Sequence, residues 1–331
     1  MKVFDLHCDT LSELRRAEMR GDGQTFARNN GHIDLEKLEK GDYMLQCFAA
    51  FVNLADPTPG ADPLVTALEE IDVFKRIMAK YPDRIAPVYT AADIRKNAEA
   101  GTISGLLTVE EGGCCKGSLG VLRRMYELGV RMMTLTWNHD NELAAPQANP
   151  GGPLAAQTQR GLTETGFAFL AEMERLHMIV DVSHLSDRGF WDIAEHSTRP
   201  FAASHSNCRA LAPHCRNLTD EMIRVMAEKG GLVGLNYCAG FLDDQPSPDL
   251  CRSTTALMAK HAAHFKQVGG IEIIGLGSDF DGIGGKLELS DAPKYPCWPM
   301  PCGKRASPRM RWKPSSSATH SVSLKTTCNH R

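Results

Sequence analysis

The sequence predicts a closed (β/α)8 barrel of the TIM type, in a single α/β domain. Short apolar runs alternate with longer helical patterns, there are eight such runs, and most of them become polar at their carboxyl ends. Strands that alternate with helices imply parallel pairing through crossover helices, and eight strands in about 280 residues fit a barrel. A doubly wound open sheet is the alternative, but no glycine-rich phosphate-binding fingerprint follows the first run.

The predicted strands are the apolar runs, which in chain order cover 2–9, 43–52, 105–111, 131–137, 178–184, 200–205, 231–237 and 273–280. Between them, helical patterns cover 63–80, 118–128, 162–177, 219–229 and 252–268. Ser118 and Thr219 are predicted to begin two of these helices, because a hydroxyl at the N-cap accepts a hydrogen bond from the first turn.

The composition is that of an ordinary globular protein, with 331 residues, 42% hydrophobic and 23% charged. A net charge of -3 gives no electrostatic reason to expect a nucleic acid or an anionic membrane as partner. No apolar run approaches the ~18–20 residues that cross a bilayer, and the first residues lack a signal-peptide pattern. The 11 cysteines lack zinc-finger spacing and are expected to be reduced thiols in a cytoplasmic protein. The sequence leaves a homodimer open.

Polar side chains end at least five of the predicted strands. In the first run, "DLHCDT", Asp5, His7 and Asp9 alternate and would share one face. Barrel active sites are built at the carboxyl ends of the strands, and the residues expected there are His7, Asp9, Glu110 or Glu111, His184, His205 and Asp279. Imidazoles mixed with carboxylates suit zinc or a similar divalent ion. A shared carboxylate would hold two ions ~3.5–4 Å apart with a hydroxide between them.

Six motifs occur in an order that resembles the renal (membrane) dipeptidase family, the binuclear zinc enzymes of the amidohydrolase-like barrels: "DLHCDT", "EGG", "DVSH", "SHS", "CRN" and "GSDFDG". The resemblance covers residues 2–296. The related deaminases and dihydroorotases open with His-x-His, whereas this chain has His-x-Asp, as the dipeptidases do. The resemblance implies a metallo-dipeptidase in which a hydroxide bridging two zinc ions hydrolyses a small dipeptide.

The resemblance also implies the metal ligands. His7 and Asp9 would bind the first zinc, and His184 and His205 the second. The family's bridging glutamate follows an apolar-apolar-x-Val-Glu strand, nine residues before a Leu-Gly-Val-Leu helix start. "LLTVE" and "LGVL" place Glu110 at this position, where it would bridge both ions and take part in catalysis. Glu111, which precedes Gly-Gly as in the family's "EGG", stays open as the alternative.

The remaining roles concern the proton and the substrate. Asp279 matches the family's acid/base, and Arg216 matches the arginine that binds the substrate carboxylate. The family often has a histidine directly after "LT" at the end of the fourth strand, but this chain has Trp137 there. Asn138 and His139 follow it and are expected to reach the same part of the substrate pocket.

The character of the sequence changes at residue 297. Residues 1–296 are assigned to the barrel, whereas 297–331 are basic, have no acidic residue and show no apolar period. We interpret this tail as frameshifted and disordered, so that the last helix covering the barrel would be missing. Two alternatives to a dipeptidase remain: another binuclear amidohydrolase acting on N-acyl amino acids or lactams, and an inactive truncated or frameshifted product.

Overall fold

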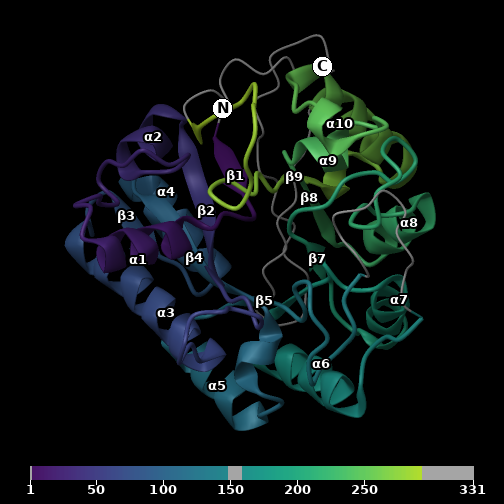
Figure 1. Cartoon of the computed structure of the whole chain (residues 1–331), viewed down its shortest axis with the longest axis horizontal. Helices are drawn as coiled ribbons and strands as arrows, with labels where there is room; N and C mark the ends of the chain where they lie inside the picture. Colours follow the sequence, from purple (N-terminus) through teal and green to yellow (C-terminus); the bar gives the residue numbers. More distant parts are fainter. Residues whose placement is uncertain (1, 148–158, 293–331) are drawn as a thin grey trace.

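A computed structural model of the chain describes residues 2–147 and 159–292, which form strands surrounded by an outer layer of helices (Figure 1). The strands are β1 (Val3–Asp5), β2 (Tyr43–Phe51), β3 (Ile85–Pro87), β4 (Ile103–Glu110), β5 (Met132–Thr134), β6 (Ile179–Asp181), β7 (Ala202–Ala203), β8 (Leu232–Leu235) and β9 (Ile274–Leu276). The α-helices are α1 (Thr10–Arg20), α2 (Leu35–Lys40), α3 (Pro63–Lys80), α4 (Ala91–Ala100), α5 (Leu119–Leu128), α6 (Glu164–Leu176), α7 (Asp187–His196), α8 (Asp220–Glu228), α9 (Ala239–Leu242) and α10 (Thr255–Gly269).

Eight of these strands form a closed parallel ring, so the predicted TIM-type barrel is confirmed. The ring runs β2-β1-β9-β8-β7-β6-β5-β4 and closes where β2 pairs with β4. Each of the eight predicted runs overlaps one ring strand. The additional strand β3 pairs with the first residues of β4, and β5 pairs with its last residues, so β3 only extends one side of the ring.

The strand β4 explains how a glutamate comes to face the inside of the barrel. Leu107 and Val109 belong to the large apolar cluster that packs between the strands and the helices. Leu106 belongs to a smaller cluster that also contains Leu45 of β2. Because alternate residues of a strand share a face, Glu110 lies on the same face as Leu106, at the carboxyl end of β4.

The two predicted helix starts are confirmed. Ser118 accepts a hydrogen bond from the backbone N–H of Val121 at the start of α5, and Thr219 accepts one from Met222 at the start of α8. These bonds satisfy N–H groups that have no partner within the helix. Each bond fixes the residue at which its helix begins. The loops that lead from the strands to these helices lie at the carboxyl ends of the strands, where the site forms.

The predicted tail, 297–331, lies outside the described residues, so the expected loss of the last covering helix stays a prediction. The division of the chain at residue 296 therefore stays a prediction. Within 2–147 and 159–292, no helix is long and apolar enough to cross a membrane. No disulfide joins the cysteines of these two segments to one another.

Candidate active site

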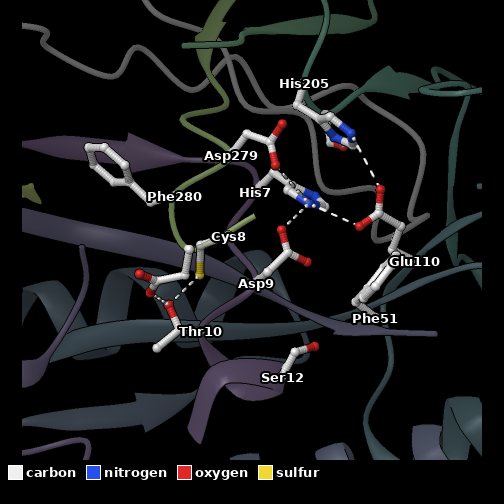
Figure 2. Close-up of polar contacts among 12 residues, drawn as sticks. His7, Cys8, Asp9, Thr10, Ser12, Phe51, Glu110, His205, Asp279 and Phe280 are labelled. Atoms are coloured by element: carbon white, nitrogen blue, oxygen red, sulfur yellow. Dashed lines mark hydrogen bonds and ion pairs between the residues drawn. The ribbon is translucent and has the colours of Figure 1, made fainter. Parts of the chain in front are cut away.

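The carboxyl ends of the ring strands bring the predicted metal ligands together. In Figure 2, His7 lies between Asp9, Asp279 and Glu110, and Glu110 reaches on to His205. His184 joins them, because its Nε2 lies 2.9 Å from Nε2 of His205. The last residue of β4 and residues just after β1, β6, β7 and β9, far apart in the sequence, thus form one cluster.

Glu110 lies between two groups of side chains. Its Oε2 is 3.3 Å from Nε2 of His7. Its Oε1 is 3.0 Å from Nε2 of His184 and 3.4 Å from Nε2 of His205. One carboxylate with an oxygen toward each group is the arrangement that two ions sharing a ligand require.

We call the side chains on either side of Glu110 the carboxylate half and the imidazole half. The carboxylate half consists of His7, Asp9 and Asp279, with Nε2 of His7 3.5 Å from Asp9 Oδ2 and 4.0 Å from Asp279 Oδ1. The imidazole half consists of His184 and His205. His7 stacks against His205 with ring centroids 3.9 Å apart, so the halves are in direct contact.

The carboxylate half favours bound protons. Burial, with the charge of Glu110 adding to it, raises the pKa of Asp9 to about 6. Burial and the charges of Asp9 and Glu110 raise the pKa of Asp279 to about 8. Burial works against a charged His7, but Glu110 and Asp9 outweigh it and hold the His7 pKa well above its usual value. This half attracts positive charge.

The imidazole half favours neutral rings. Burial, together with the charge of Arg216, lowers the pKa of His184 to about 4. Burial and the charge of His7 place the pKa of His205 well below its usual value. Both rings turn Nε2 toward Glu110, and a neutral imidazole is the form that binds a metal ion.

The donor atoms of the site fit divalent cations. In two groups, His7–Glu110–His205 and His7–Asp9–Asp279, one donor atom from each residue lies within 4.8 Å of the others. His7 Nε2 and Asp9 Oδ1 are buried without a hydrogen-bond partner among the described residues. Buried polar atoms normally have a partner. A cation bound between them would satisfy the ring nitrogen of His7 and the carboxylate oxygen of Asp9 together.

Sharp backbone turns set the directions of several side chains in and beside the cluster. Glu111, His184 and Asp279 have φ values of 96°, 66° and 61°, a left-handed conformation that residues other than glycine rarely adopt. These residues follow the ends of β4, β6 and β9. An added Cβ at Gly282 would lie 2.0 Å from Asp9 Oδ2, so only glycine fits there.

Glu111 points away from the histidines. Its Oε1 accepts from the backbone N–H of Gly113 at 2.8 Å and from Nδ2 of Asn141, and its Oε2 accepts from the N–H of Trp137 at 2.8 Å. It therefore joins the loop after β4 to the loop after β5. Glu110 lies between the histidines and Glu111 does not, although the bridging role itself stays a prediction.

Arg216 is almost fully buried beside the site. Its Nη2 donates to the backbone carbonyl of His205 at 3.3 Å, and its guanidinium lies 5.5 Å from the ring centre of Phe241. Its Nε–H has no partner among the described residues. Burial lowers the Arg216 pKa, but a guanidinium stays charged in proteins. An anion bound here would meet the positive charge of Arg216 and an N–H group that is still able to donate.

The loop after β5 forms an aromatic wall next to the imidazole half. Trp137 packs edge-on against Phe51 with ring centroids 5.0 Å apart, and its centroid lies 6.1 Å from that of His184. His139 is half-buried, with its ring 5.8 Å from that of Trp137. Asn138, expected to contact substrate, places its Oδ1 2.9 Å from Nδ1 of His184. The contact that the structure shows for Asn138 is thus with His184, a predicted metal ligand.

Supporting residues that were not expected from the sequence lie around the cluster. Asn236 donates from Nδ2 to Oδ2 of Asp279 at 2.9 Å. It directly follows the apolar run of β8, so the same polar strand end that singled out the histidines would have found it. Asp181 and Ser204 lie behind His205, and the sequence motifs contained both of them without marking them as functional.

Comparison of the sequence with known proteins gives a matching family model and several relatives. The family model described as membrane dipeptidase (peptidase family M19) matches residues 1–298. An uncharacterised dipeptidase of Schizosaccharomyces pombe is 36% identical over 310 residues, which are 89% of this chain and 73% of the relative. Dipeptidase AclJ of Aspergillus oryzae is 33% identical over 273 residues, 80% of this chain and 63% of the relative.

Solved structures agree as well. A metallopeptidase of Rhodobacter sphaeroides, liganded with a phosphinate mimic of L-Ala-D-Ala, superposes with a TM-score of 0.80 at 28% identity, over 90% of this chain and 91% of that one. Dipeptidase AC, a metallopeptidase of family M19, has a TM-score of 0.80 at 29% identity over 90% of both chains. The barrel, the candidate metal-binding residues and the matched family model lead to one conclusion: this chain belongs to the membrane dipeptidase family, the metallopeptidases of family M19.

Proposed function

We propose that the protein is a zinc-dependent dipeptidase with a binuclear centre. The observation that carries the proposal is the position of Glu110, with Oε2 toward His7 and Oε1 toward His184 and His205. His7, Asp9 and Glu110 would hold one ion, and Glu110, His184 and His205 the other. When bound, such ions polarise the peptide carbonyl and make water a nucleophile at neutral pH.

Asp279 is suited to move the proton. Its Oδ2 accepts a hydrogen bond from Asn236, and its Oδ1 faces His7. Oδ1 is therefore the atom that takes the proton from the attacking water and passes it to the leaving amine. A carboxyl group whose pKa is raised to about 8 can act as base and as acid in the neutral range.

Arg216 and the aromatic wall would orient the substrate. The buried guanidinium provides the donors for a free α-carboxylate, which favours a dipeptide over a longer chain. Trp137 and His139 line the side of the imidazole half, where one substrate side chain would pack. The phosphinate mimic of L-Ala-D-Ala in the Rhodobacter relative supports a small dipeptide whose carboxyl-side residue can be D.

The proposal is tested by measuring metal content together with hydrolysis of a substrate panel. We expect about two zinc ions per chain and turnover of L-Ala-D-Ala and L-Ala-L-Ala. The dipeptide amide, which lacks the carboxylate, should react at least about tenfold more slowly, because an unpartnered buried charge remains. Faster turnover of N-acetyl-amino acids or lactams would favour the other amidohydrolase function. A metal-loaded, folded protein without any of these activities would support an inactive product.

A further inference from the structure

Behind His205 lies a buried chain of hydrogen bonds that the proposed reaction does not use directly. Ser204 Oγ is 2.7 Å from Nδ1 of His205, on the side of the ring that faces away from Glu110. The same Oγ is 2.5 Å from Oδ2 of Asp181. Asp181, Ser204 and His205 are all at most 1% exposed.

The carboxylate of Asp181 is surrounded by donors. Its Oδ1 accepts from the backbone N–H of Ser183 at 3.0 Å and of Ser204 at 2.9 Å. Its Oδ2 accepts from the hydroxyl of Thr134 at 2.7 Å as well as from Ser204. A carboxylate that accepts several hydrogen bonds, including two from backbone N–H groups, is held in its charged form, which can only accept.

The proton on Ser204 is therefore committed to Asp181. Its oxygen is then left to accept from His205, which requires that Nδ1 of the ring carry the hydrogen. The opposite assignment would place two acceptor oxygens 2.5 Å apart without a hydrogen between them. With Nδ1 protonated, Nε2 has a lone pair and points toward Glu110 Oε1, 3.4 Å away.

We propose that Asp181 and Ser204 are positioning residues that fix the tautomer and orientation of His205, so that its Nε2 lone pair faces the metal centre. The inference rests on the proposed role of His205 as a ligand. His184 differs, because its Nδ1 meets the amide oxygen of the half-buried Asn138. Ser204 donates to a buried carboxylate, which makes its oxygen a stronger acceptor for the ring N–H, so the Asp181–Ser204 pair is the stronger support for binding a metal ion.

Thr134 provides a matched control, because its hydroxyl donates to the same Oδ2 of Asp181 but does not contact His205. Ser204→Ala and Thr134→Val each remove one buried hydroxyl from this oxygen. Metal affinity would be measured by competition with a chelator, alongside thermal unfolding of the metal-free proteins. We expect Ser204→Ala to weaken zinc binding about 10- to 100-fold and Thr134→Val about threefold or less, with similar losses of metal-free stability.

A spectroscopic readout separates positioning from packing. In the metal-free protein labelled with ¹⁵N-histidine, the ring shifts of His205 should report hydrogen on Nδ1, and in Ser204→Ala a mixture of tautomers. Asp181→Asn is the second variant and tests the same role if Ser204→Ala does not fold. Its amide can donate to Ser204, whose proton would then turn to His205 and drive hydrogen onto Nε2, and zinc affinity should fall as in Ser204→Ala.

The outcomes distinguish this inference from the proposed function. If His205→Ala binds zinc as tightly as the natural chain, the proposed centre is wrong. If His205→Ala loses zinc but Ser204→Ala and Asp181→Asn keep full affinity, the centre stands and the positioning role is wrong. Equal losses of affinity in Ser204→Ala and Thr134→Val would also overturn it, since the effect would then come from general disturbance around Asp181.

Discussion

The two halves of the site meet at Glu110 but are supported by different chemistry. In the carboxylate half, buried acids crowd one another, and the pKa of Asp279 rises to about 8. In the imidazole half, the supporting acid Asp181 is also buried, yet nearby His205 and hydrogen bonds from Ser204 hold its pKa below the usual value. Burial is common to both, so the acids beside Asp279 and the imidazole and hydrogen-bond donors around Asp181 make the difference.

The largest effect is expected at the residue that both halves share. Glu110→Gln replaces one donor oxygen by an amide nitrogen and should weaken both ion sites, lowering kcat/KM by about 10³-fold or more. Glu111→Gln changes a neighbouring carboxyl that points into the loops and should leave most of the activity. Metal content and dipeptide hydrolysis of both variants measure this. Loss of activity in Glu111→Gln with retention in Glu110→Gln would transfer the bridging role to Glu111.

Breaking one half at a time should give the next largest effect. His7→Ala removes a ligand from the carboxylate half, and His184→Ala from the imidazole half. Each variant should fall from about two bound zinc ions to one or fewer and lose at least about 100-fold in kcat/KM, since ligand loss empties a site. Full zinc occupancy with undiminished turnover in His7→Ala would refute the assignment of that half.

Much of this contrast could be predicted from the sequence, because ligands at strand ends leave a pattern. His7, Glu110 and His205 each follow an apolar run, and parallel strands bring their carboxyl ends to one rim. The direction of each side chain could not be predicted in this way. Glu110 is the last residue of β4, and the left-handed turn at Glu111 sets the direction of the second side chain. The contact of Asn138 with His184 likewise depends on how two loops meet.

A smaller effect concerns the proton carrier in the carboxylate half. Asn236 stabilises the charged form of Asp279 through its hydrogen bond to Oδ2. Asn236→Ala should therefore raise the Asp279 pKa further, shift the acidic limb of the kcat/KM profile to higher pH and lower kcat/KM about tenfold. Asn207→Ala is the control, because Asn207 holds the backbone of Asn236 but does not touch Asp279. If the acidic limb of the Asn236→Ala profile does not move, the ionisation that this limb reports does not belong to Asp279.

The smallest effect is on stability and concerns the buried Glu70 of α3, which joins α1 to the end of β2. It accepts from Ser12 Oγ and from the N–H of Phe51, and burial raises its pKa to about 8. The folded chain thus keeps a proton that the unfolded chain loses near pH 4.5. This contribution to stability is present at low pH and is lost as pH rises toward 8.

Glu70→Gln removes this titration. Its free energy of unfolding, relative to that of the natural chain, should rise between pH 5 and 8 by more than about 1 kcal/mol. Urea unfolding of the metal-free proteins across this range measures the difference. A constant difference between Glu70→Gln and the natural chain would mean that Glu70 is already ionised in the folded state.

The most direct test of the shared-ligand centre is anomalous X-ray scattering from crystals of the full chain prepared with zinc and measured at the zinc absorption edge. We expect two peaks per chain, ~3.5–4 Å apart, with Glu110 between them. One peak should lie beside His7 and Asp9 and the other beside His184 and His205. A single peak, or peaks that leave the Glu110 carboxylate without contact to either ion, would contradict the shared-ligand centre.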